Sequence, residues 1–178
     1  QLEALRMTMS KCASNRDFLL MSVDIKRAYF YAPATRPIYV QIPKEDRVAG
    51  DEDKVAKLNL SLYGTRDAAQ NWYRTYSGLL QRNGFEVGKH SAQNFFHQKR
   101  NLAVTCHGDD FTATGLESDL VWLRKLLESE YECKSEILGP NKDRHVQEMR
   151  ILNRVLTWRK DGLGYEADPR HAEIVIRE

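Results

Sequence analysis

The sequence predicts an α+β domain in which helices cover one face of a mostly antiparallel sheet. Short runs of strand-forming residues outnumber the helical segments, and several of these runs follow one another through tight turns, as antiparallel strands do. A chain of 178 residues that is 42% hydrophobic and 29% charged is typical of one globular domain with a hydrophobic core.

The first third of the chain predicts one helix and three strands. Apolar residues recur at helical spacing over residues 2–14. Residues 18–25 form a near-continuous apolar run that terminates on Asp24, and such a run is typical of a strand buried on both faces. Two shorter strands, predicted at 37–43 and 54–64, flank a polar loop.

The strongest helical pattern covers residues 66–83, where the apolar side chains share one face. Thr65 is a plausible N-cap and Gly84 a C-terminal stop. Trp72 and Tyr73 lie on the apolar face, so we expect them to pack in the core rather than to stack on bases.

The rest of the chain predicts several strands and two further helices. The expected strands are 94–98, 102–106, 111–114, 131–137 and 146–158, with a hairpin turn at Asp161-Gly162, and the expected helices are 118–129 and one that begins near Pro169. No internal repeat or linker is visible.

Charge, cysteine content and hydropathy restrict the class of protein. Residues 134–160 hold seven Lys/Arg against three Asp/Glu, which indicates either a solvated charged face or a weakly basic surface. Three scattered cysteines predict reduced thiols in an intracellular protein rather than a zinc site. No apolar run is long enough to span a membrane, so no membrane partner is expected. The chain begins without Met inside a predicted helix, so we expect a fragment of a longer protein.

Two adjacent carboxylates occupy the tip of a predicted hairpin. Strand-forming runs flank His107-Gly108-Asp109-Asp110, and Gly-Asp suits a two-residue turn. The simplest interpretation is a polar turn. Asp24 closes the apolar strand, where an ionised carboxylate is costly unless a cation such as Lys26 or Arg27 pairs with it.

The alternative for Asp24 is that it lies beside the hairpin tip, so that three carboxylates converge. Three close anions require a counter-charge, and oxygen ligands suit two Mg²⁺ or Mn²⁺ ions. Two such ions about 3.5–4 Å apart activate an attacking hydroxyl and stabilise a leaving pyrophosphate. This arrangement predicts phosphoryl transfer.

Three blocks of the chain, in order, resemble the reverse transcriptase of Ty1/copia-type retrotransposons. These blocks are "SVDIKRAYFYA", "SLYGTRDAAQNWY" and "CHGDDFTATG". The second block is the most specific because it is long. The resemblance covers residues 1–160 and implies a polymerase palm, which is a ferredoxin-like antiparallel sheet with helices on one face. It further implies a partial fingers insertion within residues 1–160, a start of the thumb or connection at 161–178, and fingers and thumb that are largely missing.

The same resemblance implies a role for each matching residue. Asp24, Asp109 and Asp110 would bind the two metal ions, together with the Ile25 carbonyl. The nucleotide would be bound by Ile25, Lys26, Arg27, Tyr29, Tyr63 and Gly64, with Tyr29 rejecting a 2′-hydroxyl, while His107 and Gly108 would lie on the primer side. Basic residues of the later segment would grip the template and primer phosphates, namely Arg144, Arg150, Arg154 and Lys160.

The implied partners are an RNA/DNA template-primer, dNTP, and the integrase and ribonuclease H of a Pol polyprotein, in a cytoplasmic virus-like particle or the nucleus. His107 and Gly108 depart from the family pattern, which has an aromatic and an aliphatic or small residue before Asp-Asp. Thr65, Asp67 and Ala69 replace the family's Leu, Gln and Pro in the second block. None of these departures removes a metal ligand.

Two other functions are compatible with parts of the pattern. A nucleotide cyclase of the Gly-Gly-Asp-Glu type also uses a strand-end Asp and an acidic hairpin, but it lacks the "SLYG" block and has Glu at the place of Asp110. A retroelement remnant that binds nucleic acid without catalysis would retain the fold, although all three carboxylates are present here.

Overall fold

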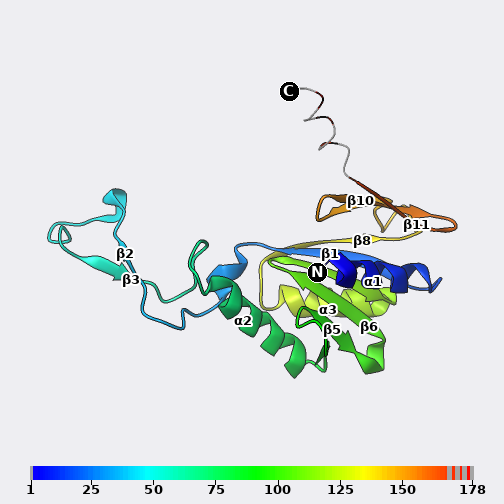
Figure 1. Ribbon diagram of the computed structural model, residues 1–178, viewed down its shortest axis with the longest axis horizontal. Helices are drawn as coiled ribbons and strands as arrows, with labels where there is room; N and C mark the ends of the chain where they lie inside the picture. The colour runs from blue at the N-terminus through cyan, green and yellow to red at the C-terminus, as the bar shows by residue number, and fades with distance from the viewer. Residues whose placement is uncertain (1, 168–169, 171–172, 174–175, 177–178) are drawn as a thin grey trace. The chain divides into compact units, whose positions relative to one another are not determined.

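The computed structural model describes residues 2–167, 170, 173 and 176. The chain forms two compact units (Figure 1). Unit 1 comprises Gln1–Lys26 and Gly84–Glu178, and unit 2 comprises Arg27–Asn83. The helix predicted to begin near Pro169 lies largely outside the described residues.

Unit 1 is built on a six-stranded sheet whose strand pairs are all antiparallel, as predicted. Its order is β4-β5-β6-β7-β1-β8. The strands are β1 (Leu19–Ile25), β4 (Glu86–Val87), β5 (Asn94–His97), β6 (Leu102–His107), β7 (Asp110–Gly115) and β8 (Cys133–Leu138), with a 3-10 turn η3 (Gln98–Arg100) between β5 and β6. The apolar β1 is therefore an interior strand, paired with β7 on one side and with the edge strand β8 on the other.

Two helices cover this sheet, α1 (Leu2–Ala13) and α3 (Glu117–Glu128). The buried side of α1 clusters with Leu20 and Leu138, while α3 contacts β1, β7 and β8. Because side chains alternate along a strand, Leu20 faces α1, and its neighbour Met21 faces the other side. The prediction that helices cover one face is therefore wrong for unit 1: β1 is apolar on both faces, and each face needs a cover.

A second, three-stranded sheet of order β11-β10-β9 packs against the α1 side of the core. It consists of β9 (Glu148–Ile151), β10 (Arg154–Arg159) and β11 (Gly162–Ala167). Residues 146–158, predicted as one strand-like stretch, are broken by a tight turn at Leu152-Asn153, where both residues have positive φ. The β10–β11 hairpin is confirmed, but Arg159 pairs with Gly162, so its turn is Lys160-Asp161 rather than Asp161-Gly162.

Unit 2 holds the long predicted helix and a small sheet. Its elements are η1 (Ala28–Tyr31), β2 (Tyr39–Gln41), η2 (Lys44–Asp46), β3 (Val55–Lys57) and α2 (Ala68–Arg82), and β2 pairs with β3. Trp72 is almost fully buried and packs edge-on against Tyr76 at 5.3 Å between ring centroids, which confirms its core role. The N-cap position is Asp67 rather than Thr65, whose hydroxyl donates to the Leu62 carbonyl instead.

None of the helices among the described residues is both long and apolar enough to cross a membrane. Cys12 and Cys106 are buried and Cys133 is half-buried, and all three are free thiols. Burial raises the pKa of each thiol, and for Cys106 the rise is large. Cys12 and Cys106 are therefore small core groups, as predicted, whereas Cys133 lies outside the core.

Candidate active site

The acidic hairpin forms as predicted between β6 and β7. His107 pairs with Asp110, so the turn consists of Gly108 and Asp109. Of these two, Gly108 has the positive φ, 64°, and glycine at the first position is typical of a type II′ turn. The turn therefore places Asp109 at the tip and Asp110 at the first position of β7.

Asp24 lies directly beside this hairpin. Asp24 on β1 is the cross-strand partner of Asp110 on β7, and the Ile25 N–H donates to the Asp109 carbonyl at 3.1 Å. Opposed residues of an antiparallel pair project to the same face, with Cβ atoms about 4.5–5.5 Å apart. The predicted convergence therefore rests on strand register for Asp24 and Asp110, and on a turn hydrogen bond for Asp109.

The electrostatics of Asp110 reflect this crowding. Burial raises the pKa of the Asp110 carboxyl above its ordinary value, and the charges of Asp109 and Asp24 raise this pKa further. His107 acts in the opposite direction and lowers it. The end of β1 is thus a place where an additional cation would be stabilised.

The donor set fits a hard divalent cation, because the three side chains offer only carboxylate oxygens. Within the part of the chain that the structure describes, no three His, Cys, Asp or Glu side chains are arranged as a cluster that could hold a metal ion. The three carboxylates are therefore neighbours with suitable chemistry but not a finished three-ligand cage. Their metal-binding role stays a prediction.

The cations around Asp24 differ from the simplest expectation. Lys26 forms an ion pair with Glu132 rather than with Asp24, so its charge is engaged elsewhere. The cross-strand partner of Asp24 on β8 is Lys134, an exposed residue on the same face of the sheet. Sequence reasoning missed Lys134, because the strand pairing of β8 with β1 is set by packing and not by a local motif.

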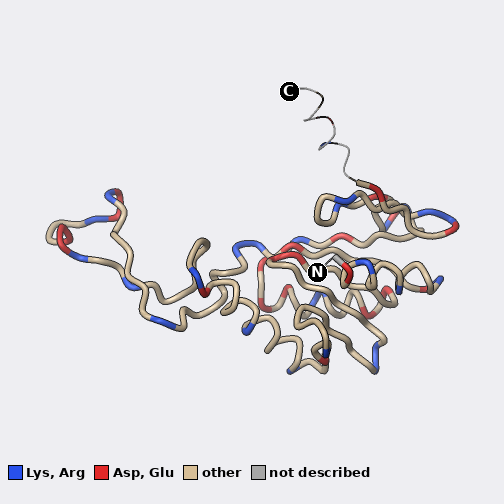
Figure 2. The backbone as a smooth tube through the Cα atoms, in the orientation of Figure 1, with Lys and Arg blue, Asp and Glu red and all other residues tan. Residues whose placement is uncertain are grey.

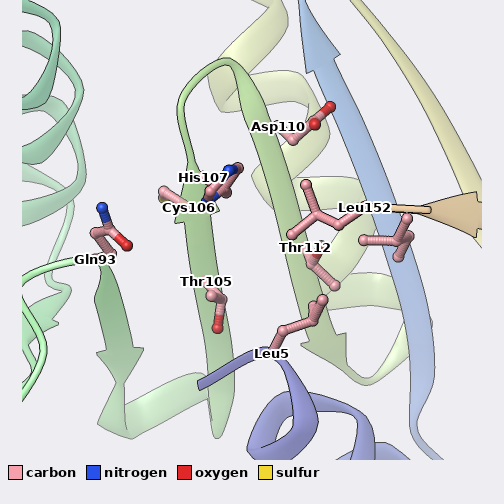
Figure 3. Close-up of a pocket in the computed structure, with 9 residues that line it drawn as sticks. Leu5, Gln93, Thr105, Cys106, His107, Asp110, Thr112 and Leu152 are labelled. Atoms are coloured by element: carbon pink, nitrogen blue, oxygen red, sulfur yellow. The ribbon is translucent and has the colours of Figure 1, made fainter. Parts of the chain in front are cut away.

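A small pocket reaches Asp110 from the α1 side of the sheet (Figure 3). His107 and Asp110 line its upper part, and Thr112 lies below them on β7. Leu152, from the turn between β9 and β10, reaches toward Thr112, and Leu5 of α1 closes the lower part. The second sheet therefore comes close to the candidate site through its unpredicted turn.

The aromatic residues predicted to lie on the nucleotide side contact one another within unit 2. Tyr29 and Tyr63 lie with ring centroids 4.4 Å apart, and Phe30 meets Tyr63 edge-on at 5.8 Å. Gly64 has φ 86° and a Cβ there would meet nothing within 4 Å, so backbone conformation rather than space favours glycine. The structure therefore brings the aromatic residues of two predicted blocks together.

The four basic residues predicted to grip phosphates do not form one cluster. Arg144 pairs with Glu117 at 3.1 Å, and the Arg154 guanidinium lies over the Tyr165 ring. Arg150 is exposed on β9, and Lys160 lies in the β10–β11 turn. These residues therefore offer separate contacts rather than a single basic patch.

The comparisons with known proteins agree with the predicted family. The model of the family described as "Reverse transcriptase (RNA-dependent DNA polymerase)" matches residues 1–143. A retrovirus-related Pol polyprotein from the transposon TNT 1-94 of Nicotiana tabacum is 31% identical over 137 residues, which is 75% of this chain and 10% of that protein. The Ty1-DR4 Gag-Pol polyprotein of Saccharomyces cerevisiae is 35% identical over 81 residues, 45% of this chain and 5% of that protein.

The chain thus spans a tenth or less of the length of these relatives. The family match covers α1, the acidic hairpin and the "SLYG" block, and it ends after β8. Both relatives are polyproteins of transposons, as the resemblance of the three blocks predicted. The chain belongs to the reverse transcriptase family, as a domain of the Ty1/copia type.

Proposed function

We propose that this chain is the palm of an RNA-directed DNA polymerase, in which Asp24, Asp109 and Asp110 bind two divalent cations. The observation that supports this most is the register of β1 against β7, which pairs Asp24 with Asp110 directly below the Asp109 turn. A strand order of β6-β7-β1-β8 with the acidic hairpin next to the central strand is compatible with a ferredoxin-like palm.

In this proposal the protein's own groups hold and orient the reactants. Asp24 and Asp110 supply carboxylate oxygens from adjacent strands, Asp109 supplies them from the turn, and the Ile25 carbonyl adds a ligand. Two Mg²⁺ or Mn²⁺ ions, when bound, would activate the primer 3′-hydroxyl and stabilise the leaving pyrophosphate. His107, exposed at the end of β6, would donate a hydrogen bond to primer phosphate or sugar.

The nucleotide-side roles rest on the family resemblance and on the aromatic cluster of unit 2. Tyr29, held against Tyr63, would lie under the sugar of the incoming dNTP and exclude a 2′-hydroxyl. Gly64 would allow close approach of its backbone to nucleotide or template. Lys26 and Arg27 would approach the triphosphate, and for Lys26 this requires exchange of its Glu132 partner.

The longer protein is proposed to be a Pol polyprotein that also carries integrase and ribonuclease H. Its substrates would be an RNA/DNA template-primer and dNTP. Within it, residues 1–160 would be the palm with a partial fingers insertion, and 161–178 would begin the thumb or connection. The two relatives, which are Pol and Gag-Pol polyproteins, support this context.

The decisive experiment titrates Mn²⁺ into the protein and follows binding by paramagnetic resonance, with and without template-primer and dNTP. Asp109→Asn removes one anion and one ligand, so we expect saturable binding in the wild type and a loss of at least tenfold in affinity in this variant. Asp17→Asn, at an exposed position before β1, is the matched control. Primer extension should fall at least about a thousandfold in Asp109→Asn.

Two outcomes would contradict the proposal. A folded wild-type protein that binds no Mn²⁺ under any of these conditions would favour the inert remnant. Formation of cyclic dinucleotide from nucleoside triphosphate alone would favour the cyclase. If a longer polypeptide extends primers while this chain binds Mn²⁺ without extension, the site assignment holds and the missing polymerase parts are required for turnover.

A further inference from the structure

A groove of about 980 Å³ lies in unit 1 at the opposite end of β1 from the carboxylates. Three separate segments form it: the loop after α1, the loop after β8, and the β10–β11 turn. Each segment contributes an exposed cation, namely Arg16, Lys142 and Lys160, and the third segment also contributes Arg159. Figure 2 shows blue segments of the first and third of these at the same end of unit 1.

Cations outnumber acids among the residues that line this groove. No ion pair joins Arg16, Lys142 or Lys160 to an acid among the described residues, whereas Arg159 pairs with Glu166 at 2.6 Å. Among the described lining residues, Asp161 is the acidic one. Three cations from distant parts of the sequence therefore face one concave surface with an excess of positive charge, which attracts polyanions.

An aromatic side chain accompanies these cations. Trp158 of β10 lines the groove and is half-buried, because one part of its ring packs against the core cluster of α1 and the second sheet. A Trp anchored in this way offers a flat surface of fixed orientation. In a paired strand the base faces are already stacked on one another, so Trp158 would pack against the apolar faces of sugars while the basic side chains meet phosphates.

We propose that this groove binds the nucleic-acid strand whose end is held at the carboxylates, as a second anchor for template-primer. The proposal rests on the proposed polymerase function. β1 has seven residues and separates the two sites by about 20 Å at 3.3 Å per residue. A duplex strand carries one phosphate per about 3.4 Å, and it must pass over α1 and the second sheet, which cover the face between the sites, so the groove would meet phosphates at least about six nucleotides from the reacting end.

A nucleic acid fits this groove better than an acidic peptide. Its charges are evenly spaced along a strand, which suits cations contributed by three separate segments, and its sugars can pack against Trp158. An acidic peptide would leave the Trp surface without a matching partner. The length dependence of binding therefore distinguishes the two, because a second anchor matters only for strands that reach it.

The test measures fluorescence anisotropy of hairpin template-primers with stems of about 4, 8 and 12 base pairs, at about 50 to 200 mM salt. EDTA is present and dNTP absent, so the readout is independent of catalysis. The groove variant is Arg16→Gln/Lys142→Gln/Lys160→Gln. The matched control is Lys89→Gln/Lys99→Gln/Lys125→Gln, which removes the same charge from exposed positions of unit 1 outside the groove.

We expect the two longer stems to bind the groove variant at least tenfold more weakly than the control, while the shortest stem binds both alike. The slope of log affinity against log salt should become shallower by roughly two to three units. Equal binding of all stems by both variants would overturn the proposal. Poly-glutamate that competes as well as the longest stem would also overturn it, because the groove would then be a general anion surface.

The test of the groove can be distinguished from the test of the proposed polymerase function. Mn²⁺ binding by the groove variant should match the wild type, because none of its three changes touches the carboxylates. Asp109→Asn should retain the length-dependent binding in EDTA. If the carboxylates bind no metal but the length dependence is present and sensitive to the groove variant, the polymerase proposal fails and the anchor stands as a nucleic-acid site.

Discussion

The two ends of strand β1 carry opposite charge. At its start, near Leu19, the adjoining loops present Arg16 and Lys142 around the groove. At its end, Asp24 lies opposite Asp110 of the acidic hairpin. One interior strand therefore runs from the groove proposed to bind phosphates to the carboxylates proposed to bind metal cations.

Between these ends, the side chains on the α1 face of the sheet change from apolar to polar and then to acidic. Leu20 is fully buried beneath α1, and its cross-strand partner Thr114 donates to the Leu19 carbonyl. One step further, Ser22 opposes Thr112, and the next pair is Asp24 and Asp110. The apolar end packs the sheet against α1 and the second sheet. Repulsion among the carboxylates at the acidic end destabilises the fold, and the packing in the rest of unit 1 offsets this free-energy cost.

The largest effect is expected from truncating Leu20, the buried residue at the apolar end of β1. Leu20→Ala would leave a cavity in a cluster shared by α1, β8 and the second sheet, and we expect a loss of about 2–5 kcal/mol in the free energy of unfolding. Leu116→Ala, at a position 42% exposed, is the control and should change it by less than about 0.5 kcal/mol. Urea denaturation followed by circular dichroism measures both. Similar midpoints for the two variants would show that Leu20 does not anchor the sheet.

A smaller effect is expected at the polar middle of the same face. Thr8 of α1 and Thr105 of β6 share a buried hydrogen bond of 2.7 Å, and Thr8 is also within 3.3 Å of the Ala4 carbonyl. We expect Thr105→Val to lower the free energy of unfolding by about 1 kcal/mol. A double-mutant cycle with Thr8→Val isolates the pair, and a coupling energy near zero would mean that the hydrogen bond does not hold α1 to the sheet.

The local features of this contrast could be predicted from the sequence. The apolar run of β1 and the Gly-Asp turn are signals contained in a few adjacent residues, and both appear where expected. The long helix α2 was predicted for the same reason. Its N-cap was not, because Thr65 and Asp67 are both suitable residues and the choice depends on how the chain enters the helix.

The non-local features could not be predicted. The β9–β10 turn places Leu152 at φ 46° and Asn153 at φ 60°, and a branched apolar residue is unusual in that region, so no turn signal marked it. The pairing of Lys134 with Asp24 and the meeting of three loops in the groove follow from the register and packing of distant segments. The residue types alone do not predict such contacts between distant segments.

Lys134 offers a way to sharpen the description of the acidic end. An ammonium group beside Asp24 partly offsets the carboxylates and repels a divalent cation. Lys134→Gln should therefore tighten Mn²⁺ binding in the absence of nucleotide by about two- to fivefold at low salt, with the gain reduced at high salt. Lys134→Arg should match the wild type, and Lys125→Gln on α3 is the control for net charge. Weaker Mn²⁺ binding in Lys134→Gln would mean that Lys134 instead orders the carboxylates.

The smallest effect concerns the stability of the acidic end without metal. The pKa of Asp110 is raised in the folded protein by burial and by Asp109 and Asp24, so the folded state binds the proton more tightly than the unfolded state. Between the ordinary pKa of 3.8 and the raised value, stability must fall as pH rises, and above this window the full penalty persists. Asp110→Asn removes the charge, so in EDTA at neutral pH its Tm should exceed that of the wild type by about 1–3 °C. The difference should shrink as the pH falls and vanish below the ordinary pKa, where Asp110 is protonated in both states. A lower Tm for Asp110→Asn at neutral pH would mean that cations such as Lys134 already stabilise the ionised trio, and the contrast between the two ends of β1 would then be one of compensated rather than exposed charge.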